Sequence, residues 1–89
     1  MYQLEFKKQA LEQVKAIAQN KKLTKKLQEI LDDIIANPYS PNFKFERLKY
    51  NLSGYYSKRL TQKDRIIYQV EDEIVTVLIL SVIGHYGDK

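Results

Sequence analysis

The chain has 89 residues, a length that predicts one domain spanning residues 1–89. Its hydrophobic content of 44%, with seven tyrosines and three phenylalanines, is typical of a globular protein and excludes a largely disordered one. It contains no cysteine, which excludes disulfides, thiolate zinc sites and cysteine nucleophiles, and its net charge of +4 weakly favours an anionic partner.

The sequence gives no indication of export or of a membrane anchor. Its N-terminal residues lack the apolar segment of a signal peptide, and the longest apolar run, residues 74–83, is too short to cross a bilayer as a helix. The absence of cysteine also fits a reducing compartment. We therefore expect a cytoplasmic protein that does not associate with membranes.

The first half of the chain predicts one strand and two helices. Residues 2–6 alternate apolar and polar side chains, as a short strand does. From residue 8 to about residue 19, and again from 23 to 36, apolar residues recur at three- and four-residue steps, which predicts two amphipathic helices. Asn20 is the predicted N-cap of the second helix, and Asn37-Pro38 ends it. Because the linker is short, we expect an antiparallel pair of helices over one face of a sheet.

The second half predicts a β-hairpin and a final strand. Residues 55–61 and 65–70 are rich in aromatic and β-branched residues and flank a polar break at Gln62-Lys63. Residues 45–52 fit either a loop or the start of a strand, with Leu48 and Leu52 as the expected buried anchors. After an acidic turn, residues 74–83 predict an interior strand covered on both faces. The order β-α-α-β-β-β predicts an α+β domain in which two helices cover one face of an antiparallel sheet.

Arg59 and Arg65 flank the turn of the predicted hairpin. The forked donors of arginine match phosphate oxygens, although two solvated surface cations are the simpler interpretation of the pair by itself. We expect both side chains on the same face of the sheet, or one of them at the turn reaching round. Lys49 and Lys58, in the same basic stretch, are further candidates for binding RNA. The hairpin also carries three tyrosines that we expect to be packing residues, Tyr55, Tyr56 and Tyr68.

Two further residues complete a candidate catalytic set. Glu46 offers a carboxylate base, and His85, the only histidine, titrates near neutrality and follows the predicted last strand. With the two arginines, they are the groups needed to cleave RNA through its own 2′-hydroxyl without a metal. A lone histidine near a C-terminus is, however, most often simply solvated.

Other site chemistries have less support. One histidine and no cysteine argue against a protein-ligated zinc ion, and no glycine-rich nucleotide-binding motif is present, so neither a metal nor a cofactor is expected. A serine–histidine pair is open by composition, but no nucleophile-elbow sequence surrounds Ser53, Ser57 or Ser81.

Four segments of the sequence resemble one protein family, the Txe/YoeB branch of the RelE/ParE toxin superfamily. The segments are Glu46-Arg47-Leu48-Lys49, Leu52-Ser53-Gly54-Tyr55-Tyr56-Ser57-Lys58-Arg59-Leu60, Asp64-Arg65-Ile66-Ile67-Tyr68 and His85-Tyr86. The expected element order also matches that of the family, so the resemblance spans the chain. Unlike many members, this chain has a lysine at position 58 and a tyrosine at position 56, and it continues through Gly87-Asp88-Lys89.

The resemblance implies a RelE/ParE-like fold and a bacterial toxin. Such toxins cleave mRNA in the ribosomal A site and are held inactive by a cognate antitoxin, here one of the YefM/Axe type; a homodimer is a further state that the resemblance allows. By position, it implies that Glu46 is the base, that Arg59 and Arg65 bind phosphate, and that His85 is the general acid. Tyr86 falls on the C-terminal tyrosine of the family, where it could stack on a base or simply cap the sheet edge.

Two other classes of function remain open at this point. A non-catalytic ParE-like toxin that binds a protein target would not need Glu46 or His85. A plain RNA- or protein-binding module would need only the basic residues. Expression of the wild type beside His85→Ala, with mapping of mRNA ends, would separate the three.

Overall fold

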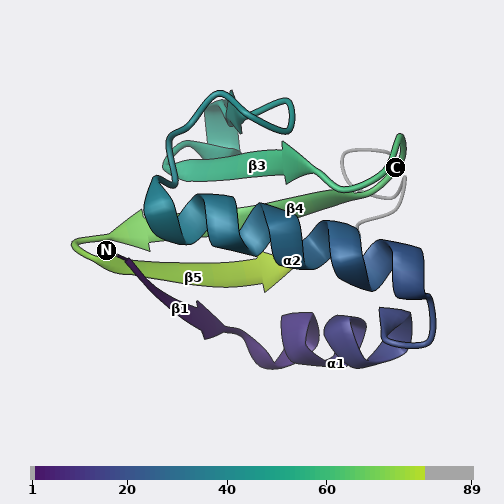
Figure 1. Ribbon diagram of the computed structural model, residues 1–89. Helices are drawn as coiled ribbons and strands as arrows, with labels where there is room; N and C mark the ends of the chain where they lie inside the picture. The colour runs from purple at the N-terminus through teal and green to yellow at the C-terminus, as the bar shows by residue number, and fades with distance from the viewer. Residues whose placement is uncertain (1, 80–89) are drawn as a thin grey trace.

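A computed structural model of the protein describes residues 2–79. Within these residues the chain forms two helices, α1 (Lys8–Ile17) and α2 (Lys21–Ala36), and a short 3₁₀ turn, η1 (Tyr50–Leu52). The strands are β1 (Gln3–Phe6), β2 (Glu46–Arg47), β3 (Tyr55–Arg59), β4 (Arg65–Glu71) and β5 (Ile74–Ile79). They form one five-stranded sheet in the order β1-β5-β4-β3-β2, with α2 lying in front of it in Figure 1. The α+β class and the two covering helices are therefore as predicted.

The sheet differs from the prediction at one edge, where β1 runs parallel to β5. Gln3 lies opposite Ile74 and Phe6 opposite Val77, whereas the other three strand pairs are antiparallel. A tight hairpin forces its two strands to be antiparallel, but β1 is joined to the rest of the sheet through both helices, and such a crossover permits the parallel arrangement. The prediction of a wholly antiparallel sheet is wrong for this pair. The sheet also has one strand more than the four that were predicted. This is the two-residue strand β2, so residues 45–52, which fitted either a loop or the start of a strand, contain a short strand.

The linker between the helices is fixed by Asn20, as predicted. Its Oδ1 accepts a hydrogen bond from the Leu23 backbone N–H at 3.0 Å. The Thr24 hydroxyl donates to the Asn20 carbonyl at 3.0 Å, and the Asn20 N–H donates to the carbonyl of Ile17 at 2.9 Å. This capping begins α2 two residues earlier than its apolar stripe indicated and ends α1 at Ile17.

The hydrophobic core lies between the helices and one face of the sheet. Its buried residues come from α1 and α2 and from β3's end, β4 and β5: Ala10, Leu27, Ile30, Leu31, Ile34, Leu60, Ile66, Tyr68, Val75 and Val77. Burial raises the pKa of Tyr68, whose hydroxyl donates to the carbonyl of Pro38 at 2.6 Å. Leu48 and Leu52 are only half-buried, contrary to prediction: Leu48 follows β2 at the sheet edge, where a strand has a neighbour on one side only, and Leu52 ends the turn η1.

The opposite face of the sheet is not part of this core, yet it contains buried positions. Ser57 and Ile67, which lie opposite each other on β3 and β4, are 0% and 2% exposed. Their strand neighbours Lys58 and Ile66 point to the helix side, because successive side chains of a strand alternate between faces. Across residues 2–79, neither helix has the length and apolar character needed to span a membrane.

Candidate active site

The three strands β2, β3 and β4 bring three of the predicted charged residues to the face of the sheet opposite the helices. Glu46 on β2 lies opposite Ser57 on β3, and Arg59 on β3 lies opposite Arg65 on β4. Cross-strand partners share a face, and so do Ser57 and Arg59, which are two positions apart on one strand. The connection between the strands, residues 60–64, is odd-numbered, and the prediction that both arginines share a face is confirmed.

Hydrogen bonds hold that connection in one shape. The backbone N–H groups of Leu60 and Thr61 donate to the carbonyl of Asp64 at 2.9 and 3.1 Å. The Thr61 Oγ1 accepts from the N–H of Lys63 at 3.1 Å and from that of Asp64 at 3.0 Å. The ends of β3 and β4, where the two arginines sit, are therefore joined by a well-braced loop.

The Arg65 guanidinium is shared between two neighbours that differ in exposure. Its Nη1 donates to Ser57 Oγ at 3.1 Å and lies 3.3 Å from Glu46 Oε1. Ser57 is fully buried, whereas the Glu46 side chain is 56% exposed and that of Arg65 is 24% exposed. An ion pair as exposed as this one contributes at most about 1 kcal/mol, so the contact to Glu46 is easily exchanged for another anion.

Arg59 completes the positive side of the site. Its backbone N–H donates to the carbonyl of Phe43 at 2.7 Å, which fixes the end of β3 against the loop after α2. Within residues 2–79, no carboxylate lies in ion-pair range of its guanidinium. Like charges directly opposite each other on paired strands destabilise a sheet. The pairing of Arg59 with Arg65 is thus a local cost that a bound anion, such as a phosphate, would offset.

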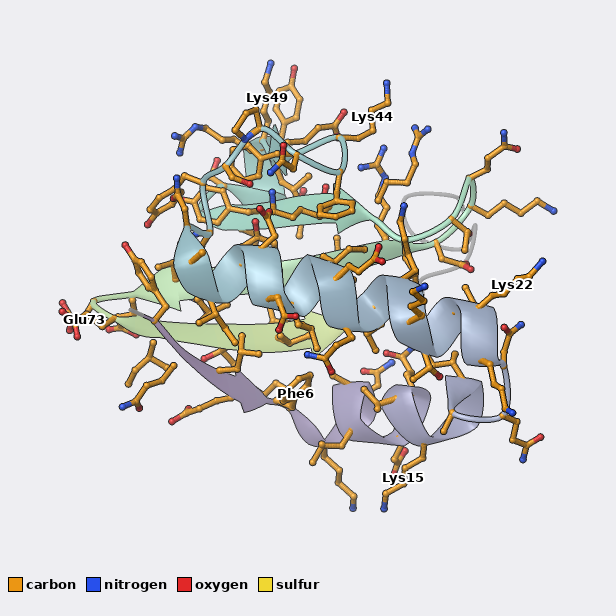
Figure 2. All side chains as sticks on the ribbon, viewed as in Figure 1. Phe6, Lys15, Lys22, Lys44, Lys49 and Glu73 are labelled. Carbon is orange, nitrogen blue, oxygen red and sulfur yellow. The ribbon has the colours of Figure 1, made fainter. Side chains whose placement is uncertain are left out.

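Three of the five predicted catalytic residues, Glu46, Arg59 and Arg65, thus lie on one face and next to one another in the strand order. His85 and Tyr86 fall outside the described residues. Lys49 is exposed in the connection between β2 and β3, three positions after Glu46, and it projects away from the sheet in Figure 2.

Lys58 does not belong to this face, and its predicted role in binding RNA is wrong. Its side chain is 0% exposed and faces α2, because its strand neighbours Ser57 and Arg59 occupy the other face. The Nζ donates to the carbonyl and hydroxyl oxygens of Ser40 at 2.8 and 3.0 Å and to the carbonyl of Asn42 at 2.9 Å. It also lies 3.3 Å from Asp33 Oδ2, in the last turn of α2.

The network around Lys58 changes the acidity of both of its charged members. Burial by itself would raise the pKa of Asp33, but hydrogen bonds from Ser40, Asn42 and Lys58, with the lysine charge, outweigh it, and the pKa lies below the ordinary 3.8. Burial lowers the pKa of Lys58, while the hydrogen bond and charge of Asp33 oppose that shift. The network ties the end of α2 to the middle of β3, directly behind Ser57.

Two features of this region were not identified from the sequence. One is Ser57, which the strand alternation could have placed beside Arg59. The other is Arg47, whose guanidinium carbon lies 5.5–5.7 Å from the ring centres of three aromatic residues, Tyr39, Phe45 and Tyr56. Arg47 lies opposite Tyr56 and therefore on the helix side, away from Arg65. Tyr56 and Tyr68 pack as predicted, with ring centres 5.9 Å apart.

An open hollow elsewhere on the surface is not part of this site. It is lined by Gln3, Asp72, Glu73 and Ile74, at the β4–β5 turn, where Glu73 projects in Figure 2. Because β4 runs from Arg65 to Glu71, this turn lies at the opposite end of the strand from the arginine pair.

The comparisons with known proteins agree on one family. The model of the YoeB-like toxins of bacterial type II toxin–antitoxin systems matches residues 6–86, a range that includes all five predicted catalytic positions. Toxin YoeB of Escherichia coli is 39% identical over 67 residues, which are 75% of this chain and 77% of that toxin. Toxin RelK of Mycobacterium tuberculosis is 32% identical over 62 residues, 70% of this chain and 73% of that toxin.

Solved structures give the same result for the fold. The toxin in the YoeB–YefM toxin–antitoxin complex of Staphylococcus aureus superposes with a TM-score of 0.81 at 36% identity, covering 91% of this chain and 95% of that one. A YoeB dimer from the same species gives a TM-score of 0.81, also at 36% identity, over 90% of this chain and 94% of that one.

Proposed function

The chain belongs to the YoeB-like toxins of bacterial type II toxin–antitoxin systems, and we propose that it is a ribosome-dependent endoribonuclease of the cytoplasm that cleaves mRNA and so inhibits translation. The observation that supports this activity best is the placement of a solvent-accessible carboxylate, Glu46, beside two arginines, Arg59 and Arg65, on one face of the sheet. These are groups that can bind a phosphodiester and accept a proton next to it.

In the proposed mechanism the nucleophile is the RNA's own 2′-hydroxyl. Glu46 takes the proton from the 2′-oxygen as this oxygen attacks the neighbouring phosphorus. Arg59 and Arg65 stabilise the charge that builds up on the phosphate oxygens, and His85 donates a proton to the 5′-oxygen as its bond to phosphorus breaks. The products are a 2′,3′-cyclic phosphate and a 5′-hydroxyl. Each proton-transfer group contributes about 10²–10⁴-fold to the rate, and a positioned cation contributes about 3 kcal/mol.

Two further residues are proposed to hold the RNA. Lys49 is exposed three positions after Glu46, where an ammonium group can bind a neighbouring phosphate as a point charge. Tyr86 would stack on an unpaired base, as aromatic side chains do in single-strand-binding sites. No metal or cofactor takes part in the proposed steps.

Growth and mRNA mapping in cells test the function. Expression of the wild type should stop growth and produce new mRNA ends within codons. Glu46→Gln should lower cleavage by about 10²–10⁴-fold, because the amide cannot accept the proton, and His85→Ala should do the same. Lys22→Gln, an exposed change on α2, which lies on the other side of the sheet from the site, is the matched control and should retain activity. Growth arrest that both site variants retain would indicate a non-catalytic ParE-like toxin instead.

The proposed partner is a cognate antitoxin. The S. aureus relative was solved in complex with YefM, and the arginine-lined face of this chain is complementary to an acidic segment. We propose that such a segment of a YefM-like antitoxin covers Arg59 and Arg65 and excludes RNA. Self-association is proposed as well, on the example of the S. aureus YoeB dimer.

Antitoxin binding should raise the thermal stability of the toxin. A ligand that binds only the native state adds roughly 4 kcal/mol to the free energy of unfolding when its free concentration is about 1,000 times its Kd. For a domain of this size, that raises the melting temperature by roughly 15 °C or more. Calorimetry with the antitoxin encoded beside this toxin measures the shift. An antitoxin whose segment has its carboxylates changed to amides should give a much smaller one, and an equal shift with both would contradict an electrostatic contact at the arginines.

A further inference from the structure

A buried hydroxyl lies behind the arginine of the site. Ser57 is fully buried on β3, with Glu46 opposite it on one neighbouring strand and Ile67 on the other. Its Oγ accepts a hydrogen bond from Arg65 Nη1 at 3.1 Å, and the same nitrogen lies 3.3 Å from Glu46 Oε1. We propose that Ser57 is a positioning residue, which holds the Arg65 guanidinium at the scissile phosphate while Glu46 is released to act as the base. This inference rests on the proposed endoribonuclease function.

The two contacts of the Arg65 guanidinium differ in how strongly water competes with them. Water competes directly for the Glu46 carboxylate, whose side chain is 56% exposed. Water has no access to the Ser57 hydroxyl, which is 0% exposed, and a hydrogen bond shielded in this way is stronger than one at the surface. When RNA arrives, the contact to Glu46 is the one that exchanges.

The chemistry of cleavage also requires a second partner. As Glu46 takes the proton from the 2′-oxygen, its carboxylate becomes a neutral acid and loses its charge attraction for Arg65. In the transition state, the orientation of the guanidinium must therefore come from another group. Ser57 does not change its charge during the reaction, and it accepts from only one of the five N–H donors of arginine, so a guanidinium held in this way can still donate to phosphate oxygens.

The position of Ser57 makes it a rigid support. Its strand is paired on both sides, so the backbone is fixed, and a serine side chain has a single heavy-atom torsion. Arginine, in contrast, has a long side chain with large rotamer entropy. A short hydroxyl on a fixed strand restricts that freedom before the substrate binds, which is preorganisation of the kind that speeds a reaction.

Single-turnover cleavage on ribosomes programmed with mRNA tests the inference. Ser57→Ala should lower the rate at saturating toxin about tenfold and change the half-saturating concentration less than twofold, because the arginine charge remains but its orientation is lost. Ser57→Cys replaces only the hydroxyl oxygen, by a slightly larger sulfur that accepts hydrogen bonds weakly, and it should show an intermediate loss. Ser40→Ala removes another buried serine hydroxyl, one that bonds Asp33 and Lys58 on the helix side, and it should cleave at the wild-type rate.

A double-mutant cycle separates positioning from a general loss of structure. In an Arg65→Ala background, Ser57→Ala should change the cleavage rate less than twofold, since nothing is left to position. A second readout does not require activity: in the free toxin, ¹⁵N relaxation of the Arg65 side-chain Nε–H should show greater motion in Ser57→Ala and unchanged motion in Ser40→Ala.

Three results would overturn the inference. They are wild-type cleavage by Ser57→Ala, the same tenfold loss in the Arg65→Ala background, and an Arg65 side chain equally mobile with and without the Ser57 hydroxyl. If Ser57→Ala does not fold, Ser57→Cys decides by the same measurements. A wild-type toxin that cleaves no mRNA on ribosomes would remove the proposed function, whereas the relaxation measurement would still establish or reject the tether between Ser57 and Arg65.

Discussion

RNA with hydrogen in place of the 2′-hydroxyl at the nucleotide 5′ to the scissile bond should be bound by the toxin–ribosome complex but not cleaved. In the proposed mechanism that hydroxyl is the nucleophile, so its removal leaves Glu46 with no proton to take. Binding should survive, because phosphate contacts dominate the affinity of proteins for nucleic acids and the substitution leaves every phosphate in place. Cleavage and binding are measured on the same programmed ribosomes, by product analysis and by toxin retention.

The control is an mRNA with the same substitution two nucleotides from the scissile bond, which should be cleaved at the native rate. Magnesium is held constant throughout, since ribosomes need it. Arg65→Ala should weaken both binding and cleavage, because this arginine is proposed to contact phosphate in the ground state and in the transition state. Native-rate cleavage of the deoxy substrate, or products with a 5′-phosphate and a free 3′-hydroxyl, would show that water is the nucleophile and that the role proposed for Glu46 is wrong.

Lys58→Met should destabilise the fold by about 3–5 kcal/mol, the usual effect of breaking a buried ion pair by removing one partner. The change strips Asp33 of its counter-charge and leaves the carbonyls of Ser40 and Asn42 without their donor. A domain of 89 residues is stable by about 4–13 kcal/mol in total, so this loss is a large fraction of it. Urea unfolding measures the difference.

The matched control is Lys22→Met, which removes an equal charge from an exposed position on α2 and should change stability by less than about 0.5 kcal/mol. Adding Asp33→Leu to Lys58→Met should recover part of the loss, since replacing both members of a buried pair by apolar residues is far less harmful than removing one. Equal stability of Lys58→Met and the wild type would show that the network contributes nothing to the fold.

The same network makes the stability of the fold depend on pH. Because the pKa of Asp33 is below 3.8 in the native state, its contribution to stability is complete above pH 3.8 and is lost as the pH falls through the native-state pKa. Lys58 makes stability change in the same direction but in an alkaline range: its pKa is lowered, so the unfolded chain binds the proton more tightly, and stability rises with pH between the native-state pKa and 10.5. In Lys58→Met, the loss of stability in acid that comes from Asp33 should become smaller, and the change of stability at alkaline pH that comes from Lys58 should disappear.

Local pattern predicted most of the fold and about half of the site. The helices and the hairpin followed from periodicity and from residues such as Asn20, because those signals are contained in short segments. The parallel pairing of β1 with β5 did not, since the partner of an edge strand is decided by distant residues. Lys58 was predicted on the wrong face of the sheet, because its charge was given more weight than the alternation of side chains between the two faces of β3. Ser57 was not identified, because no sequence pattern distinguishes a serine with a role in a site from any other serine on a strand.

The five residues of β3 contribute to two different structures, the arginine site on one face of the sheet and the buried lysine network on the other. Ser57 and Arg59 belong to the face that is proposed to bind RNA, and Lys58 between them anchors the strand to the end of α2. A slip of β3 by one residue against its neighbours would turn every side chain to the other face. Ser57 and Arg59 would then face the helices, and Lys58 would lose its hydrogen bonds to the carbonyls of Ser40 and Asn42. A slipped chain would therefore lose both the buried lysine network and the arginine site. The proposed nuclease activity should therefore be lost completely in a chain whose β3 has slipped, and such misfolded toxin should contain no partly active molecules.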